Sequence, residues 1–483
     1  MADSTLVSVS GVVGHAVLTK VGAMITNYVA IPAVALVCLV APLPAWAGGI
    51  EYPDNGTVAI GRGGAWAANP SDGLAFQYNP AGLAQQRGWN LTLDARLANQ
   101  QIKFTSTSIK GEPAQNSAPP FLSPSAAVSY GLGKLGPLSE FTIALGATGP
   151  SSIGISNWPQ TGVQRYALRN TDYFIGFYSL ALAGGIGDWL RFGVTGQIAQ
   201  GSAKFNQAVW SDTFTGENPQ VDTDATFSGK NSGQPTGVIG ITVLPTPQWA
   251  IGLSWRPALH FAAPGTLVTV PPDAVKGDAK QVGDKAELRL AFADIVRLGV
   301  LHKPKPGWEV EANVVYERWS VLQEIRVHTL DVTVVPTADP TQSTKVPDIV
   351  FPHNFRDTVS LRLGGEHEIM PDRLTLRAGY IYETSAVPSE YVSVDFANWG
   401  RNVASVGASL RAFGASLDLA FAHHFIETQV VTDSKVEQKL TPPLYSFMTS
   451  PKPMIVGNGT YQASLDVVSL SLQVPFGSLK AGF

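Results

Sequence analysis

The sequence contains little charge and almost no cysteine, and both shortages restrict its class. Charged residues make up 14% of its 483 residues, against roughly 25% in an ordinary soluble protein, so we expect much of its surface to face lipid. Its net charge of −4 and the lack of a basic run give no signal for nucleic acid. The single cysteine, Cys38, lies in the N-terminal leader, so the chain from Gly48 onward uses no disulfide even in an oxidising compartment.

Long hydrophobic runs are also missing after the leader. No run of about 18 apolar residues follows residue 47, which excludes a membrane-spanning helix there. The leader is apolar over residues 28–44 and ends in Ala45-Trp46-Ala47, an order typical of a secretory signal peptide with a small-residue cleavage site. A transmembrane anchor is the alternative, but three prolines interrupt the apolar stretch. We therefore predict a cleaved signal peptide at residues 1–47.

Alternation of apolar and polar residues dominates the rest of the chain. In the stretch 189–200, Leu190 and Phe192 fall on one face of an extended chain and Arg191 falls on the other, as in a β-strand. The pattern recurs in fourteen segments, which six short turns and seven long polar loops join in strict alternation. The predicted strand cores are residues 89–103, 121–131, 140–149, 172–183, 189–200, 237–244, 248–261, 287–301, 308–319, 356–369, 374–384, 401–412, 415–426 and 461–476.

These strands and connections predict an all-β fold, a 14-stranded antiparallel transmembrane β-barrel formed by residues 89–483. The strands are long enough to cross the apolar part of a bilayer at a tilt. A soluble β-sandwich is the alternative, but its outer faces would be polar, whereas the second face of several strands here is small or uncharged. Aromatic residues at strand ends are assigned to interfacial girdles: Trp89, Trp189, Trp249, Trp308, Tyr316 and Trp319.

The same alternation assigns eight charged side chains to the barrel interior. We interpret most of them as hydration of the lumen. A subset is a candidate for pairing with a fatty carboxylate, since arginine binds carboxylates through two parallel hydrogen bonds. The eight are Arg191, Arg297, Arg362, Arg377, Glu309, Glu311, Glu366 and Asp418.

Residues 48–88 precede the first strand, are rich in apolar and small residues, and carry few charges. The chain enters the first strand and leaves the last strand on the short-turn side of the barrel. Fourteen strands enclose a lumen that wall side chains alone do not fill. A disordered tail is the alternative, but the segment is too apolar for one. We predict that residues 48–88, called the hatch below, fold into the lumen as a plug, with a turn at Asn79, Pro80 and Ala81.

Four stretches carry a resemblance to a known family. Asn79-Pro80-Ala81 follows the glycine- and alanine-rich segment 61–73, and Gln164-Arg165-Tyr166 precedes the fourth strand. A tryptophan-containing strand end lies at 316–320, and residues 355–391 contain Arg-Asp, Arg-Ala-Gly-Tyr and Val-Pro in order. Together these stretches resemble the FadL/TodX family of outer-membrane transporters for long-chain fatty acids and aromatic hydrocarbons. The resemblance implies a plugged barrel for passive uptake, with Asn79, Pro80 and Ala81 as its hatch motif, and no enzymatic activity.

One candidate site lies at the end of the third strand, where Gly146, Gly149 and Pro150 follow in close succession. Glycine within a strand favours a bulge, and proline cannot donate to the ladder, so we predict a kink or break in the wall. The resembled family has such a kinked strand, which implies that the ligand leaves sideways into the membrane. The alternative is that these residues only begin the next loop.

A second candidate site consists of apolar islands in the long loops. We predict them as ligand contacts, the alternative being that they only pack the loops. They are Phe261, Leu267, Val268, Val270, Phe351, Phe355, Leu444, Tyr445 and Phe447. No motif predicts a cofactor, a metal site or a catalytic residue, since the adjacent His423 and His424 would point to opposite faces of a strand.

The sequence thus predicts a monomeric channel, exported to the bacterial outer membrane, for passive uptake of hydrophobic small molecules. It would contact outer-membrane lipid and lipopolysaccharide and bind no nucleic acid. Two alternative functions stay open. A general polar porin would keep an open lumen without an apolar plug, and a structural or adhesive barrel would act through its loops.

Overall fold

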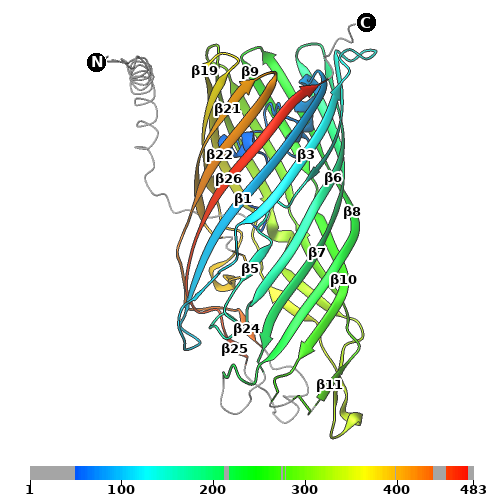
Figure 1. Ribbon diagram of the computed structural model, residues 1–483, viewed down its shortest axis with the longest axis vertical. Helices are drawn as coiled ribbons and strands as arrows, with labels where there is room; N and C mark the ends of the chain where they lie inside the picture. Colours follow the sequence, from blue (N-terminus) through cyan, green and yellow to red (C-terminus); the bar gives the residue numbers. More distant parts are fainter. Residues whose placement is uncertain are drawn as a thin grey trace, which may run out of the picture. The chain divides into compact units, whose positions relative to one another are not determined.

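The computed structural model describes residues 49–210, 217–273, 276–277, 279–396, 399–438 and 453–476. They form a closed antiparallel β-barrel of fourteen wall strands, as predicted (Figure 1). Two of these wall strands are briefly interrupted, so that each consists of two segments: β9 with β10, and β12 with β13. The wall strands are β1 (Gly88–Ser106), β3 (Phe121–Gly131), β4 (Glu140–Thr148), β6 (Asn170–Ile186), β7 (Leu190–Val209), β8 (Thr223–Thr246), β9 (Trp249–Arg256) with β10 (Leu259–Val270), β12 (Lys285–Phe292) with β13 (Asp294–His302), β14 (Trp308–Arg318), β19 (Thr358–Met370), β20 (Leu374–Glu383), β21 (Arg401–Ala412), β22 (Ala415–Ile426) and β26 (Gly459–Phe476).

The first and last wall strands close the barrel. β1 pairs with β26 along its whole length, from Trp89 opposite Phe476 to Ser106 opposite Gly459, and Figure 1 shows the two side by side. Every other wall strand pairs with its neighbours in chain order. Closure leaves neither of these two strands with a free edge in the membrane, where unpaired backbone groups would be costly.

Alternate residues of the wall strands face outward and inward as predicted. On β26, Leu470 is 49% exposed on the outer face, whereas its neighbour Ser471 is 2% exposed on the inner face. Aromatic pairs mark the short-turn end of the wall, with the Trp89 ring 5.8 Å from that of Phe476 and the Trp249 ring 4.1 Å from that of His302. Among the described residues, no helix has the length and apolar character that a membrane-spanning helix requires.

Some wall strands run further than predicted at the long-loop end. Residues 201–236 were expected to form a loop, but β7 continues to Val209 and β8 begins at Thr223, and these extensions pair with each other. Ala203 continues the inward-facing side of β7 and is buried. The strands therefore carry the lumen beyond the membrane, where polar outer faces replace the apolar ones.

Shorter elements cover the long-loop end. β5 (Ile155–Asn157), β15 (Glu324–Thr329) and β18 (Ile349–Pro352) extend the wall sheet, and β11 (Ala279–Val282) forms a separate sheet with β16 (Thr333–Pro336) and β17 (Thr344–Lys345). The others are β2 (Ala114–Gln115), β23 (Gln429–Val431), β24 (Glu437–Gln438), β25 (Met454–Ile455), η3 (Trp319–Val321), η4 (Pro340–Gln342) and η5 (Ser389–Tyr391).

Candidate functional site

The hatch lies inside the barrel and contains one short α-helix and two 3-10 helices. These are α2 (Thr57–Gly61), η1 (Gly73–Gln77) and η2 (Pro80–Gln85), and their side chains are almost all buried. Two wall glycines make room for it, because a Cβ atom at Gly193 would lie 2.5 Å from the carbonyl carbon of Pro80, and one at Gly240 would lie 2.0 Å from Oδ1 of Asn79. The hatch and the inner wall are therefore in backbone-to-backbone contact.

The predicted turn at Asn79, Pro80 and Ala81 begins η2. Asn79 is extended, as a residue before proline should be, and its Oδ1 accepts a hydrogen bond from the Ala81 N–H (3.1 Å), which caps η2. Its amide nitrogen donates to the Ala67 carbonyl (2.8 Å), the Ile241 carbonyl (3.2 Å) and Thr242 Oγ1 (3.1 Å). One buried side chain thus joins two parts of the hatch to β8.

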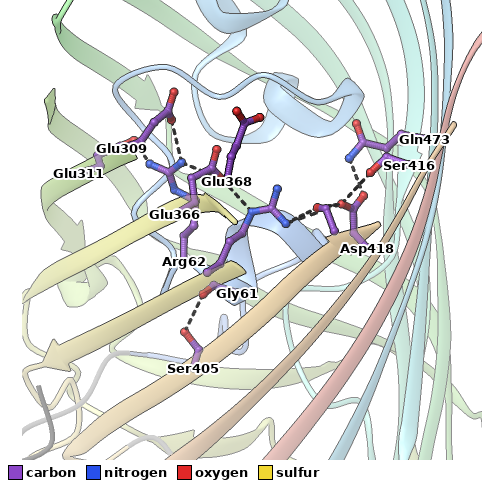
Figure 2. Close-up of polar contacts among 12 residues, drawn as sticks. Gly61, Arg62, Glu309, Glu311, Glu366, Glu368, Ser405, Ser416, Asp418 and Gln473 are labelled. Carbon is purple, nitrogen blue, oxygen red and sulfur yellow. Dashed lines mark hydrogen bonds and ion pairs between the residues drawn. The ribbon is translucent and has the colours of Figure 1, made fainter. Parts of the chain in front are cut away.

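A network of charged groups anchors the hatch on the other side of the lumen (Figure 2). Arg62, which directly follows α2, is fully buried and pairs with Glu309 (3.1 Å), Glu366 (3.3 Å) and Glu311 (3.4 Å). Glu311 also accepts hydrogen bonds from the backbone N–H groups of two hatch alanines, at 2.8 Å each. The sequence assigned these carboxylates to the lumen correctly, but did not identify them as partners of the hatch.

The network continues around the wall from Glu366. Arg377 pairs with Glu366 (2.8 Å) and lies 3.7 Å from Asp418, which also accepts a hydrogen bond from Gln473 (2.7 Å). These groups lie on β14, β19, β20, β22 and β26, and Figure 2 labels Glu366, Asp418 and Gln473 among them. The lumen beside this part of the hatch is therefore polar and lined with paired charges.

A cavity of about 840 Å³ lies between the hatch and the short-turn ends of the wall. Gln85 and Gln86 of the hatch line it, together with Arg411 of β21 and with Arg373 and Phe413 of the short turns. The side of the hatch that faces the short turns therefore meets a space lined by both polar and apolar groups.

The wall between β4 and β6 is interrupted near the predicted kink. Pairing along this side of β6 stops where Phe177 lies opposite Thr148, and it resumes where Asp172 lies opposite Ile155 of β5. The intervening segment 149–154 belongs to no strand. The ladder therefore has a gap of a few residues in this part of the wall.

Segment 149–154 leaves the wall toward the lumen. The Gly149 carbonyl accepts a hydrogen bond from the amide of the hatch residue Asn55 (2.9 Å), and the Pro150 carbonyl accepts one from the buried Arg96 (2.8 Å). Gly146 does not take part in this departure, because it pairs regularly with Ala127 and Ser179. A Cβ atom there would lie 2.4 Å from the Phe76 ring, so this glycine makes room for the hatch.

The half of the lumen near the long loops is lined by buried apolar side chains, called here the loop-end cluster. Of the predicted ligand contacts, Phe261, Leu267 and Phe355 belong to it and Phe351 packs against it. Val268 and Val270 do not. They are 45% and 52% exposed on the outer face of β10, because neighbours in a strand point to opposite sides. The remaining predicted contacts, Leu444, Tyr445 and Phe447, lie outside the described residues.

Three tryptophans in this cluster were not predicted to face the lumen. Trp158, Trp319 and Trp399 are among its largest fully buried side chains. Trp319 was assigned to an interfacial girdle, which is wrong, because the strand ends before it and the ring turns inward, where its indole N–H donates to Glu317 (2.6 Å). Tryptophan at a strand end does not by itself distinguish a membrane interface from the lumen.

The start of the hatch forms the floor of the loop-end cluster. Ile50 belongs to the cluster, and a Cβ atom at Gly49 would lie 2.1 Å from the Trp319 ring. The hatch thus lies between the apolar loop-end cluster and the cavity of mixed lining near the short turns. Within the described part of the chain, no group of three or more His, Cys, Asp or Glu side chains is arranged to hold a metal ion.

The chain matches one family model and several solved structures. The model describes an outer membrane protein transport protein (OMPP1/FadL/TodX) and matches residues 38–462. A Pseudomonas aeruginosa FadL homologue has 17% sequence identity and a TM-score of 0.70, over 89% of this chain and 100% of that chain. The Ralstonia pickettii toluene transporter TbuX has 14% identity and a TM-score of 0.59, over 89% of this chain and 100% of that chain. The Pseudomonas putida toluene transporter TodX has 14% identity and a TM-score of 0.61, over 88% of this chain and 99% of that chain. At these identities the structures show a shared fold, and no curated protein sequence matches the chain.

Proposed function

This chain belongs to the OMPP1/FadL/TodX family of outer-membrane transport proteins, and from that premise we propose that it is a channel for passive uptake of hydrophobic small molecules. The observation that carries the proposal is the loop-end cluster, an apolar lining inside a barrel whose floor is the hatch. Long-chain fatty acids and aromatic hydrocarbons are the candidate substrates. Two of the similar structures are toluene transporters.

The physical problem for such a substrate is the layer of polar lipopolysaccharide outside the membrane. An apolar molecule gains about 25 cal/mol for each Å² of apolar surface that it removes from water. A water-filled pore offers none of this gain in free energy. The loop-end cluster instead offers apolar side chains that the substrate can contact before it reaches the membrane. Residues Phe261, Leu267 and Phe355 are the contacts that we propose for it.

The way out of the lumen is the gap in the wall between β4 and β6. Straight ahead the substrate would have to displace the buried Arg62 network before it reached the cavity near the short turns. Segment 149–154 instead leaves the wall beside the hatch, which supports release sideways into the outer membrane. We propose that the hatch stays in place during transport.

The N-terminal leader and the location of the protein are the remaining parts of the proposal. We propose that residues 1–47 are a cleaved signal peptide that directs the chain to the outer membrane, where it acts as a monomer in contact with lipid and lipopolysaccharide. Retention of the leader on the protein isolated from outer membranes, as measured by mass spectrometry, would contradict the cleavage.

A large side chain over the wall gap tests the route. Gly176 of β6 lies beside the gap, and a Cβ atom there would meet nothing closer than 3.4 Å, so Gly176→Trp has room at its first atom. We expect this variant to lower uptake of radiolabelled toluene and oleate by cells that have no other such channel. Tyr178→Trp, at an outward position that is 56% exposed, is the matched control and should transport normally.

Planar bilayer recordings distinguish the alternatives. A steady, large ion conductance in the wild type would favour a polar porin, because an anchored hatch blocks the lumen. Wild-type cells whose uptake of both substrates equals that of cells lacking the protein would favour a structural or adhesive barrel. Normal uptake by Gly176→Trp would contradict only the sideways route.

A further inference from the structure

Arg96 joins the hatch to the segment that leaves the wall. It lies on the inner face of β1, is 0% exposed, and forms no ion pair with any residue that the structure describes. One terminal nitrogen, Nη1, donates to the hatch carbonyls of Pro53 and Asp54, the latter at 3.2 Å. The other, Nη2, donates to the carbonyls of Pro150 (2.8 Å) and Ser152 (3.4 Å). One guanidinium thus holds two separate segments, one with each of its ends.

Segment 149–154 is longer than the stretch of wall that it passes. The ladder with β6 ends at Thr148 of β4 and resumes at Ile155 of β5. Six residues of the chain, 149–154, therefore pass four residues of β6, 173–176. In a regular antiparallel ladder the two numbers would be equal, so two residues are surplus and must bulge out of the plane of the wall.

Donors inside the barrel decide the direction of this bulge. The side-chain amide of the hatch residue Asn55 donates to the Gly149 carbonyl (2.9 Å). Ser123 of β3 and Arg96 both donate to the Pro150 carbonyl, at 3.1 and 2.8 Å. An outward bulge would turn these carbonyls toward lipid, which offers them no donor. The segment therefore folds toward the lumen, and the wall opens beside the hatch.

The two-ended link needs the shape of arginine. A guanidinium presents its donors on both sides of a rigid, planar fork, whereas the lysine side chain ends in a single nitrogen. The carbonyls of Pro53 and Pro150 bond to different nitrogens of Arg96. All the hydrogen bonds of this buried cation go to backbone carbonyls of the two segments, so its task is to fix their positions.

We propose that Arg96 is the positioning residue of the exit, which holds segment 149–154 inside the barrel, and so keeps the wall gap open, only while the hatch is docked. This inference rests on the proposed sideways release and adds its regulation. A hatch that left its place would take Asn55 away from the segment and free the Nη1 end of Arg96. The gap in the wall would then close when the plug opened, so the two routes exclude each other.

Arg96→Met tests the link, because methionine is a long side chain without a donor. We expect the initial rate of labelled oleate uptake to fall by about ten-fold, the change in an equilibrium that the loss of one hydrogen bond from a charged donor produces. In the purified protein, amide hydrogen exchange in segment 149–154, followed by mass spectrometry, should become faster by about the same factor. Arg96→Lys keeps the charge but not the fork, so both measurements should change in the same direction.

Asp94→Ala is the matched control. Asp94 lies two residues from Arg96 on the same face of β1 and accepts two hydrogen bonds from the hatch residue Thr57, at 2.7 Å each. It forms no hydrogen bond to segment 149–154 within the described chain. Its loss therefore loosens β1 from the hatch without reaching the segment, and we expect uptake and exchange at the wild-type level.

The outcomes separate this inference from the function beneath it. Wild-type uptake or wild-type segment exchange in Arg96→Met, full uptake by Arg96→Lys, or an equal loss of uptake in Asp94→Ala would each overturn the link. Wild-type cells that take up no more oleate than cells lacking the protein would overturn the uptake function itself. The heat-dependent shift of the barrel on a gel reports folding. If Arg96→Met does not fold, Asn55→Ala carries the same expectation, because it removes another donor from the segment.

Discussion

Replacing Asn79 by alanine or by aspartate separates the two tasks of its side chain. Alanine removes both the cap on η2 and the donor contacts to Ala67, Ile241 and Thr242. Aspartate keeps the capping oxygen but places a second acceptor, with a negative charge, against two carbonyl oxygens. The structure therefore predicts that aspartate, the closer match in shape, is the more damaging change.

The magnitude follows from the buried contacts. Loss of a cap costs about 1 kcal/mol, and each buried acceptor that loses its donor costs about 1–3 kcal/mol when water cannot replace it. Thr242 Oγ1 retains a contact to the Ala68 carbonyl, so we expect a total of about 3–5 kcal/mol for Asn79→Ala. Asn79→Asp should cost more, because a buried, unpaired carboxylate adds its own desolvation penalty.

The assay measures closure of the hatch while the wall stays folded. We expect both variants to keep the heat-dependent gel shift of the barrel, because the wall ladder does not use the Asn79 side chain. Ion conductance in planar bilayers should rise from wild type to Asn79→Ala to Asn79→Asp. Gln85→Ala is the control, since the Gln85 amide donates to two carbonyls within the hatch at 2.9 Å each and forms no hydrogen bond to the described part of the wall. Wild-type conductance in both Asn79 variants, or a milder effect of aspartate than of alanine, would refute the reasoning.

Three further predictions concern the wall, the anchor and the loops. Leu470→Arg should destabilise the barrel by roughly 2–4 kcal/mol if it lies near the midplane, and Ser471→Arg should cost less; equal shifts in the urea midpoint would contradict the assigned faces. Arg62→Met should weaken hatch docking by about 3–5 kcal/mol, because it leaves buried carboxylates unpaired, and brief channel openings should report it; an unaltered, silent recording would count against the anchor. Burial lowers the pKa of His353, but the Asp395 carboxylate at 2.9 Å raises it by more, so the net pKa lies above its ordinary 6.5. A raised histidine pKa stabilises the loop below pH about 6.5 and loses that effect as the pH rises through the folded-state value, so protease should cut this loop faster at pH 8.5 than at pH 6, and His353→Gln should abolish the difference.

The wall was the predictable part of this protein because its physics is local. A strand between lipid and lumen must alternate, so the sequence of each strand carries its own two faces. The outward Leu470 and the inward Arg377 follow from this rule alone. The same rule also corrects the ligand prediction, because it separates Leu267 from Val268, which composition had grouped together.

The contacts of the hatch could not be read in this way, because they join residues far apart in the chain. Arg62 meets Glu311 across 249 positions, and nothing near either residue identifies the other. Gly146 shows the same limit. Its sequence context suggests a bend in the strand. The structure shows instead that glycine is needed there because the Phe76 ring of the hatch lies against it. The wall gap itself depends on where the carbonyls of segment 149–154 find donors, and these lie on the hatch, β1, β3 and β6.

A disulfide between the hatch and the wall tests most directly whether transport leaves the hatch in place. Thr57 Oγ1 and Ser469 Oγ lie 2.7 Å apart, a separation that brings the two Cβ atoms near the range of a disulfide, and the chain from Gly48 onward has no other cysteine. We expect Thr57→Cys with Ser469→Cys to take up labelled oleate at the same rate when oxidised as when reduced. Uptake that falls in proportion to cross-linking and returns on reduction would show that the substrate passes through the place of the hatch, and would contradict release through the wall.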